Sequence, residues 1–478
     1  MGAGMRLYFA TIPIMLSVVL SGCGGGASKT SSPPPPAIHN EWAWINGLNA
    51  DNHAVGIYGT QGVTLPTNLP GGRVSAASWT DANGSFWLFG GLGFDSAGNL
   101  DRLNDLWKYS NGQWTWMGGS NLVRQPGVYG TQGTASPGNF PGAHAYAVSL
   151  VDSAGNVWLF GGDGMASSGT GGLLNDLWKF SNGQWTWVSG SDVGAEPGVN
   201  GAWQGTGVYG TKGVADATNV PGARSGASGW ADSSGNLWLF GGEGVDSMGK
   251  LGPLNDLWKY SNGEWTWMAG SNLANQFGTY GTQSAGAPGN TPGGRTGAST
   301  WTDSQGNLWL FGGLGADDAT VGKCNLLPEP CLLNDLWKYS NGQWTWVGGS
   351  NIIDAPGNYG TQGLAATNNW PPPRTSAVAW TDSSGNFWLF GGNFVDDFND
   401  LWKYSGGEWT WVSGSNQQCQ AGTYGTEGTP LSGNAPDARD GSVGWIDLSG
   451  NLWLFGGASS CPGDNTAWKY NDLWEYRP

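Results

Sequence analysis

Trp87-Leu88-Phe89-Gly90-Gly91, followed by Asn104-Asp105-Leu106-Trp107, is a phrase that this chain of 478 residues contains six times. The copies of the first part begin at Trp87, Trp158, Trp238, Trp309, Trp388 and Trp453, and those of the second part begin at Asn104, Asn175, Asn255, Asn334, Asn399 and Asn471. A regular internal period predicts one repetitive architecture rather than several unrelated domains. Residues that recur in every copy are expected to serve the scaffold, so function is expected where the copies differ.

Each repeat predicts four short antiparallel strands. In the first repeat the alternating patterns place them at 73–79, 85–91, 104–109 and 113–118. Asp81-Ala82-Asn83-Gly84 and Ser110-Asn111-Gly112 predict the turns between them, the second as a three-residue turn. Four such strands with aromatic residues on their faces are typical of one propeller blade.

The phrase resembles the Kelch-repeat family, because paired glycines follow an apolar strand and an aromatic residue follows Asn-Asp-Leu-Trp in every copy. The resemblance covers 41–478 and implies a β-propeller of the galactose-oxidase-like type. The chain departs from the family in length, since its repeats are spaced by 65 to 80 residues against about 50. The excess lies in the connectors between repeats, where Tyr-Gly-Thr-Gln-Gly (at Tyr58 in the first) itself recurs.

The two ends of the chain complement each other. The sixth repeat stops at Tyr476-Arg477-Pro478 without a Trp-x-Trp strand, whereas Glu41-Trp42-Ala43-Trp44 closely matches Glu264-Trp265-Thr266-Trp267. We therefore predict an all-β fold, a six-bladed Kelch-type propeller over 41–478, whose last blade is completed by an outer strand at 41–46. Such closure removes exposed sheet edges.

The segment before the repeats predicts export and lipid attachment. Leu7 to Leu20 is an apolar run, and Leu20-Ser21-Gly22-Cys23 resembles a bacterial lipobox, so 1–23 reads as a lipoprotein signal peptide with lipid on Cys23. An ordinary secretory signal is the alternative. The Gly-, Ser- and Pro-rich residues 24–40 predict a tether. We expect a lipid-anchored protein of the cell envelope, in the bacterial outer membrane or at the cell surface.

The composition argues against one class of partner and indicates the state of the cysteines. The net charge is −16 and only 11% of the residues are charged, which disfavours nucleic acid because phosphate contacts supply most of that affinity. Four cysteines remain after Cys23, and an even number in an exported protein predicts disulfides. Three pairings are possible, and proximity favours Cys324 with Cys331, leaving Cys419 with Cys461. Zinc is the alternative, but no histidine lies nearby and the spacing matches no zinc motif.

Three of the 32 tryptophans do not recur: Trp203, Trp370 and Trp468. The others occupy equivalent positions in nearly every repeat and predict packing between blades. In a four-stranded blade, the loops from second to third strand and the connectors are expected on one face, which we call the loop-rich face. The unique tryptophans and both presumed disulfides fall there, and ligand binding usually uses such loops. The alternative is that each tryptophan fills its own loop.

A second candidate set opens the first strand of each repeat: Arg73, His144, Arg224, Arg295, Arg374 and Arg439. Around the mouth of a central channel these residues would form a cationic ring that selects anionic groups, such as uronic acids or acidic peptides. The alternative is that each arginine holds down a connector.

The Kelch resemblance also implies comparison with galactose oxidase, whose copper needs two histidines and two tyrosines, one of them joined to a cysteine. This chain has three histidines, His39, His53 and His144, so we expect no copper, no other cofactor or metal, and no galactose-oxidase chemistry. We predict a monomeric, surface-tethered module that binds a glycan or protein on the loop-rich face. The alternatives are a non-metal carbohydrate-active enzyme, such as an epimerase, lyase or oxidase, and a purely structural envelope component.

Overall fold

The computed structural model describes residues 40–49, 54–198, 202–318, 331–461 and 469–478. The chain divides into two compact units, 1–37 and 38–478, and every described residue belongs to the second. All regular elements among the described residues are β-strands, and none of these residues forms a helix that could cross a membrane. The signal peptide, Cys23 and the tether to residue 39 lie outside the described residues.

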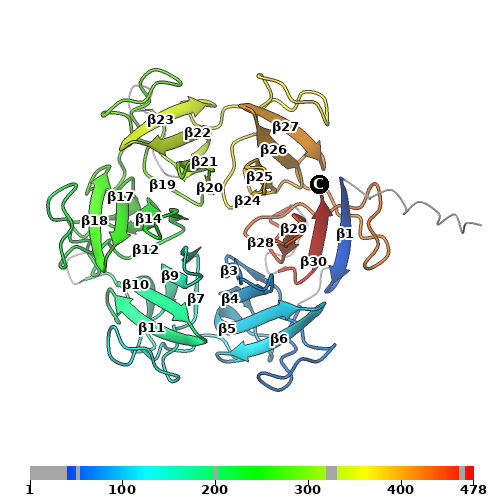
Figure 1. The fold of residues 1–478 in the computed structure, drawn as a ribbon, viewed down its shortest axis with the longest axis horizontal. Helices are drawn as coiled ribbons and strands as arrows, with labels where there is room; N and C mark the ends of the chain where they lie inside the picture. Colours follow the sequence, from blue (N-terminus) through cyan, green and yellow to red (C-terminus); the bar gives the residue numbers. More distant parts are fainter. Residues whose placement is uncertain (1–39, 50–53, 199–201, 319–330, 462–468) are drawn as a thin grey trace, which may run out of the picture. The chain divides into compact units, whose positions relative to one another are not determined.

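The strands follow the repeats (Figure 1). The first repeat contains β2 (Arg73–Val74), β3 (Ala77–Thr80), β4 (Phe86–Phe94), β5 (Leu100–Ser110) and β6 (Gln113–Gly118). The second contains β7 (His144–Ala145), β8 (Val148–Val151), β9 (Val157–Met165), β10 (Gly171–Ser181) and β11 (Gln184–Ser189). The third contains β12 (Arg224–Ser225), β13 (Ser228–Ala231), β14 (Leu237–Phe240), β15 (Glu243–Val245), β16 (Leu251–Pro253), β17 (Leu257–Ser261) and β18 (Glu264–Ala269).

The remaining repeats have the same pattern. The fourth contains β19 (Arg295–Thr296), β20 (Ser299–Thr302), β21 (Leu308–Gly315), β22 (Leu332–Ser340) and β23 (Gln343–Gly348). The fifth contains β24 (Val378–Thr381), β25 (Phe387–Phe390), β26 (Leu401–Ser405) and β27 (Glu408–Ser413). The sixth contains β28 (Val443–Ile446), β29 (Leu452–Phe455) and β30 (Leu473–Arg477), and β1 (Glu41–Asn46) joins it from the other end of the chain.

Neighbouring strands within each repeat are antiparallel, as predicted. In the first repeat the inner strand is interrupted between β2 and β3, where Ser75 has a φ of 52°. In the sheet of the sixth repeat the strand order is β1-β30-β29-β28. The register of β1 with β30 pairs Glu41 with Arg477 and Trp44 with Trp474. One sheet therefore contains strands from both ends of the described chain.

The inner strands also contact one another from repeat to repeat. β3 contacts β8, β8 contacts β13, β13 contacts β20, β20 contacts β24, β24 contacts β28, and β28 contacts β3. Figure 1 shows the sheets grouped around a common centre. Six backbone hydrogen bonds of 2.7–3.0 Å link the interruptions of these strands in a closed cycle: Ser75 to Gly441, Gly441 to Ser376, Ser376 to Gly297, Gly297 to Gly226, Gly226 to Tyr146, and Tyr146 to Ser75. All six residues have positive φ, between 52° and 67°.

The paired glycines lie where adjacent sheets meet. In the last repeat the N–H of Gly457 donates to the carbonyl of Arg73 in the first repeat, at 2.9 Å. The φ of Gly456 is 69°, and a Cβ there would lie 2.8 Å from the same Arg73 oxygen. A side chain at Gly456 would therefore push against the neighbouring sheet, which explains why glycine recurs at this position.

Tryptophans and other large side chains form the core between neighbouring sheets. The Trp445 indole of the sixth repeat stacks on Phe86 of the first, with ring centroids 5.2 Å apart. Its Nε1 donates to the carbonyl oxygen of Trp87 at 3.1 Å. This interlocking agrees with the prediction that recurring tryptophans hold adjacent sheets together.

Both predicted turns can be explained from their residues. Asp81 Oδ1 accepts from the backbone N–H groups of Asn83 and Ser85, and its Oδ2 accepts from Trp87 Nε1 at 2.9 Å. The second turn is a two-residue rather than a three-residue turn, because Ser110 pairs with Gln113 across it. Asn111 and Gly112 between them both have positive φ, the geometry that favours Asn-Gly in hairpins.

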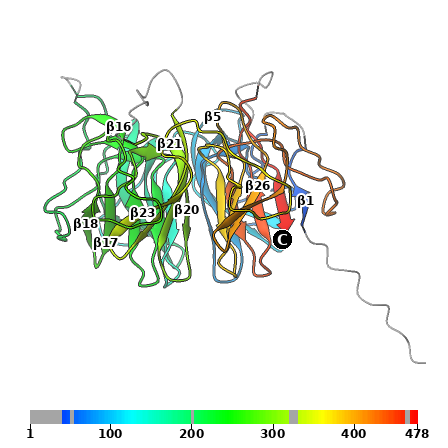
Figure 2. The same cartoon turned by 90° about the horizontal axis from the view of Figure 1, so that it is seen from above.

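The connectors also reach the outer edges of the sheets. The middle of each connector follows the outer strand of the repeat that it enters. Before the second repeat, Gly133 donates to the carbonyl of Trp187 at 2.8 Å, and Asn139 Nδ2 donates to that of Trp185 at 3.3 Å. The connectors thus occupy backbone groups of the outer edge, which limits edge-to-edge pairing between molecules. Figure 2 shows the longer loops, including the hairpin that ends in β16, on one face.

Candidate ligand-binding site

The five arginines of the predicted ring are buried instead of facing a channel. Arg73 is 1% exposed, and its Nη1 and Nη2 donate to the two carboxylate oxygens of Asp105 at 2.7 and 2.8 Å. Its remaining donors reach the carbonyls of Gly71 and Gly90. Equivalent pairs join Arg224–Asp256, Arg295–Asp335, Arg374–Asp400 and Arg439–Asp472. The structure therefore corrects the expectation that these guanidinium groups line the mouth of a channel. Their contact with a ligand stays a prediction.

The aspartate of each pair belongs to Asn-Asp-Leu-Trp. Besides the arginine, Asp105 accepts from the Tyr58 hydroxyl at 2.6 Å and from Trp107 Nε1 at 2.7 Å. Tyr58 is the tyrosine of the connector repeat, so one buried carboxylate joins the connector, the inner strand and the third strand. This arrangement fits the alternative that arginine holds down the connector.

His144 replaces arginine in the second repeat and leaves the equivalent carboxylate, Asp176, without a guanidinium. The imidazole is buried, with Nδ1 2.7 Å from the Gly142 carbonyl and no hydrogen bond to Nε2. Burial lowers the pKa of His144 to about 4. Burial also raises the pKa of Asp176 to about 6, although Tyr129 and Trp178 still donate to this carboxylate.

The two unique tryptophans that the structure describes, Trp203 and Trp370, lie in different connectors and pack against different clusters. Trp370 is partly buried, packs against Trp409 with ring centroids 6.3 Å apart, and donates from Nε1 to the Asn334 carbonyl at 2.6 Å. Trp203 is partly buried in the third repeat, where its N–H donates to the Gly249 carbonyl at 2.8 Å. Trp468 lies outside the described residues. The Trp203 side chain packs against Ala195, Ala223 and Val245. Trp370 contacts residues of the fourth and fifth repeats rather than only its own loop, and a ligand role for either tryptophan stays a prediction.

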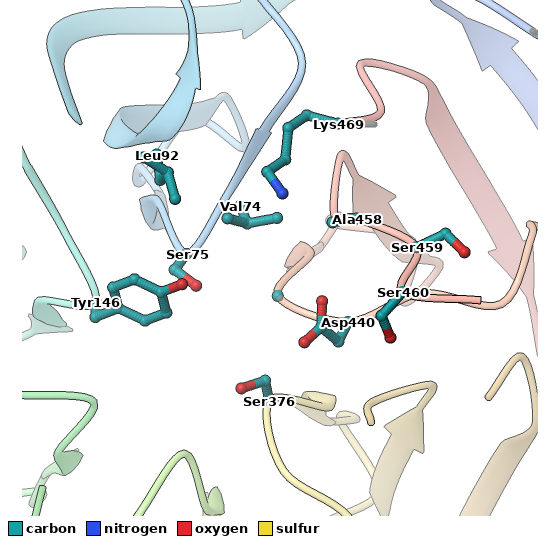
Figure 3. Close-up of a pocket in the computed structure, with 11 residues that line it drawn as sticks. Val74, Ser75, Leu92, Tyr146, Ser376, Asp440, Ala458, Ser459, Ser460 and Lys469 are labelled. Atoms are coloured by element: carbon teal, nitrogen blue, oxygen red, sulfur yellow. The ribbon is translucent and has the colours of Figure 1, made fainter. Parts of the chain in front are cut away.

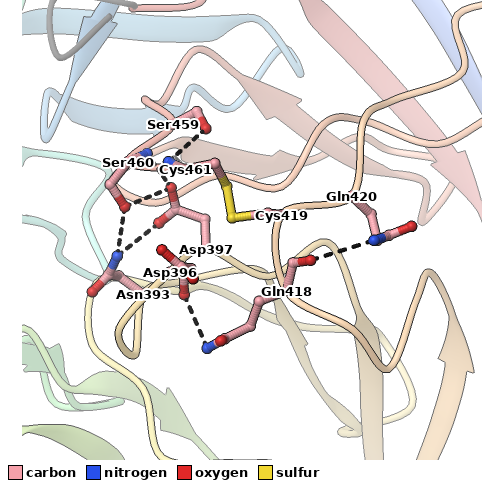
Figure 4. The surroundings of a disulfide bond; sticks show 9 residues. All are labelled: Asn393, Asp396, Asp397, Gln418, Cys419, Gln420, Ser459, Ser460 and Cys461. Carbon is pink, nitrogen blue, oxygen red and sulfur yellow. Dashed lines mark hydrogen bonds between the residues drawn. A yellow bond between two sulfur atoms is a disulfide. The ribbon is translucent and has the colours of Figure 1, made fainter. Parts of the chain in front are cut away.

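One of the two predicted disulfides is present, between Cys419 and Cys461 (Figure 4). It lies beside Asp397, whose carboxylate accepts from Asn393 Nδ2 at 3.0 Å and from the Ser460 hydroxyl at 2.9 Å. The disulfide therefore supports the loop that contains Ser460. Cys331 is buried, and its predicted partner, Cys324, lies outside the described residues.

The described residues do not fit a copper site of the galactose-oxidase kind. His39 and His53 lie outside the described residues, and His144 is buried in the scaffold. Within the part of the chain that the structure describes, no group of three or more His, Cys, Asp or Glu side chains is placed to hold a metal ion.

The repeats differ in a short row of three residues that pair across adjacent strands or bridges. The row contains the residue after the arginine or histidine, the residue after the glycine pair, and the residue two before Asn-Asp-Leu-Trp, which pair with one another across adjacent strands. The six rows are Val74-Leu92-Arg102, Ala145-Asp163-Leu173, Ser225-Glu243-Pro253, Thr296-Leu314-Leu332, Thr375-Asn393-Asp397 and Asp440-Ala458-Lys469. Recurring scaffold residues flank every row.

A cavity of about 260 Å³ adjoins the sixth row and the cycle of backbone hydrogen bonds (Figure 3). It is lined by Val74, Ser75, Leu92, Tyr146, Ser376, Asp440, Gly441, Ala458, Ser459, Ser460 and Lys469. Four members of the cycle thus contribute to the wall. The side chains supply a carboxyl, an amine, a phenol, several hydroxyls and a small apolar area, which is a composition suited to a polar ligand.

Asp440 and Lys469 dominate the electrostatics of this cavity. Burial, together with the neighbouring Asp397 carboxylate, raises the pKa of Asp440 to about 7, against the opposing effect of Lys469. Burial lowers the pKa of Lys469. Burial likewise raises the pKa of the Tyr146 phenol, with Asp440 adding to the effect. The cavity thus contains a carboxyl group that changes protonation near neutral pH, beside an amine whose pKa burial lowers.

Sequence reasoning missed Asp440, Lys469 and Tyr146. An alignment of the six repeats could have found them, because each of the three residues lies at a fixed distance in sequence from a recurring residue and differs from the residues at the same position in the other repeats. Asp440 directly follows Arg439, for example, where the other repeats have valine, alanine, serine or threonine. Comparison of tryptophans alone could not find it, since the cavity is built from positions beside the scaffold rather than from large insertions.

No protein-family model matches the sequence, and no curated protein sequence matches it. Some solved structures have a similar backbone arrangement. The structure of YjhT is 13% identical over 85% of this chain and 96% of that chain, with a TM-score of 0.46. A fungal alcohol oxidase of the AA5 family, in complex with copper, is 12% identical over 88% of this chain and 76% of its own, with a TM-score of 0.44. At such identities these similarities carry no information about the cavity residues.

Proposed function

We propose that this protein is a surface-tethered binding module, whose glycan or protein ligand places a small polar group in the cavity beside Asp440 and Lys469. The repeats would form a six-bladed Kelch-type propeller closed by β1, with the N-terminal lipid on Cys23 as its anchor in the outer membrane. The repeated contacts between inner strands, and the pairing of β1 with β30, support this architecture.

The observation that carries the binding role is the contrast between the rows and their surroundings. Arginine–aspartate pairs, glycine pairs and indoles are repeated almost without change. The row that lines the cavity instead has an acid where the other repeats have valine, alanine, serine or threonine, and it has the only amine among the six rows. Buried ionisable groups reduce stability unless something compensates for their desolvation. Their position in an open cavity, rather than in the packed core, favours a ligand as that compensation.

A second candidate is a carbohydrate-active enzyme that uses no metal. Asp440, with a pKa of about 7, could exchange a proton with a substrate, and the Lys469 amine and the Tyr146 phenol lie in the same cavity. General acid–base catalysis needs a group whose pKa is near the working pH. Turnover of a bound sugar, followed by NMR, would separate this candidate from simple binding.

The binding proposal is tested with the soluble body, residues 41–478, on a glycan array and in a pull-down from envelope extracts. Asp440→Thr and Lys469→Leu introduce residues from equivalent positions in other repeats, so the scaffold should tolerate them. We expect both variants to lose captured ligand while Trp203→Ala retains it. Capture that survives both cavity variants would remove the cavity from the proposal.

A further inference from the structure

Asp440 and Lys469 are opposite charges that belong to one row but do not meet. Asp440 pairs with Ala458, and Ala458 pairs with Lys469, in isolated antiparallel bridges. Residues directly opposite each other on adjacent strands project to the same side of a sheet. The carboxyl and the amine therefore project to one side with a methyl group between them, and their Cα atoms are about 10 Å apart at two strand-pair spacings of roughly 5 Å.

Neither charged group lies within 4.0 Å of an opposite charge in the described part of the chain, although each is influenced by the charge of the other and by that of Asp397. Neither side chain there forms a hydrogen bond with the side chain of another residue, whereas nearby Asp397 accepts hydrogen bonds from Asn393 and Ser460. Other ionisable groups near the cavity are engaged, since Arg102 pairs with Asp101 and Asp163. Asp440 and Lys469 thus remain as one donor group and one acceptor group that a single ligand can bridge.

The rest of the cavity limits the size and character of that ligand. A volume of about 260 Å³ corresponds to roughly nine waters at ~30 Å³ each, which is room for one small molecule or one chain terminus. Val74 and Leu92 supply an apolar side, and Ser75 and Ser376 supply hydroxyls. Figure 3 shows these side chains around the opening between Lys469 and Asp440.

We propose that the cavity binds a zwitterion of α-amino-acid type, with the ligand ammonium against Asp440 and the ligand carboxylate against Lys469. The apolar part of the ligand lies toward Val74 and Leu92, and the serine hydroxyls complete its hydrogen bonds. This inference rests on the proposed binding function and specifies its ligand class. A neutral sugar could hydrogen-bond to both groups but would leave each charge without an opposite charge.

Four small probes test the two charge contacts separately by calorimetry and saturation-transfer NMR. L-leucine carries both charges, L-leucinamide only the ammonium, N-acetyl-L-leucine only the carboxylate, and glucose neither. We expect leucine to bind at least about tenfold more tightly than each of the other three, a difference of about 1.4 kcal/mol. Equal affinity of leucine and either single-charge analogue, or no binding of leucine, overturns the inference.

Variants taken from other repeats assign the contacts. Asp440→Thr should abolish the preference for leucine over N-acetyl-L-leucine, and Lys469→Leu should abolish the preference for leucine over L-leucinamide. Exposed Glu427 and Lys250 provide matched controls, since Glu427→Gln and Lys250→Met remove the same charges outside the cavity. Near-UV circular dichroism of the tryptophans checks that each variant is folded.

Proton release gives a second readout. An ammonium group against Asp440 favours the ionised carboxylate, so leucine binding near pH 7 should release protons, and the apparent binding enthalpy should change with the ionisation enthalpy of the buffer. Asp440→Thr should remove that dependence. If glucose binds, releases no protons and is lost in Asp440→Thr, the binding function stands and the zwitterion is wrong. If array and extract ligands are also unaffected by the cavity variants, the proposed function itself fails.

Discussion

Arg73 and Asp105 form a buried ion pair with two hydrogen bonds, of 2.7 and 2.8 Å, and four other repeats contain its equivalent. The two residues come from the inner and third strands of one sheet. The same carboxylate also accepts from the connector tyrosine Tyr58. Loss of the cation would therefore leave a buried charge at a junction of three segments.

Replacement of Arg73 by methionine should destabilise the protein strongly. Removal of one partner from a buried pair typically costs about 3–5 kcal/mol because the other charge remains desolvated. Arg73→Met with Asp105→Asn should recover part of this loss. Arg124→Met is the control, since that side chain is 57% exposed and should change stability by less than about 1 kcal/mol. Urea unfolding followed by tryptophan fluorescence measures all three, and equal effects of Arg73→Met and Arg124→Met would contradict the prediction.

His144→Arg should stabilise the protein. Five repeats accommodate arginine at this position, and the new guanidinium would find the Asp176 carboxylate and the Gly142 and Gly161 carbonyls where the others find their partners. Hydrogen bonds to charged groups contribute about 1.5–3 kcal/mol, so the urea midpoint and Tm should rise at pH 7. His144→Lys introduces a cation that lacks the planar guanidinium group, so it should increase the stability by less. No gain for arginine would mean that the second repeat has adapted around histidine.

Asp176 should make stability depend on pH in a direction opposite to that of an ordinary paired carboxylate. Its pKa rises from 3.8 to about 6 on burial, so the folded state holds the proton more tightly than the unfolded state. This contribution is fully present below about pH 4 and is lost as pH rises through 6. His144 has the opposite effect, because its folded-state pKa is lowered from 6.5 to about 4.

Asp176→Asn isolates that effect. The difference in unfolding free energy, variant minus wild type, should increase by about 2 kcal/mol between pH 4 and pH 6 and by about 3 kcal/mol in total, levelling off above about pH 7. The His144 contribution cancels in this difference because both proteins contain it. Urea titrations across that pH range provide the measurement, and a difference that does not change with pH would show that folding does not raise the pKa of Asp176.

Replacement of Cys419 and Cys461 by serine should weaken both the fold and the cavity wall. The disulfide joins residues 42 apart, a separation for which chain entropy alone gives at most about 4 kcal/mol. Because Cys461 follows Ser460, the double variant should also loosen the Ser460–Asp397 contacts. Hydrogen exchange should increase at 458–461 but not in the hairpin turn at Asp81. Unchanged exchange at 458–461 would mean that the hydrogen bonds alone hold this loop.

The sequence could predict the strands because their determinants are local: alternation within each strand and turn residues between strands. The burial of Arg73 was not local, since it depends on Asp105, which is 32 residues away. Both residues recur, however, and recurrence alone indicated a scaffold role. Asp440 and Lys469 were harder to predict. Their proximity follows from the pairing register across three strands, and their charges stand out only when the same positions are compared between repeats.

The pairing of β1 with β30 has a consequence for how the protein is made. Glu41 and Arg477 become neighbours only after all the repeats between them have been synthesised. Until then Trp42 and Trp44 have no sheet to join, and contacts of such long sequence separation form slowly because loop closure must come first. β1 is thus expected to be among the last strands to dock, and until it docks its two tryptophans offer an apolar target to a chaperone.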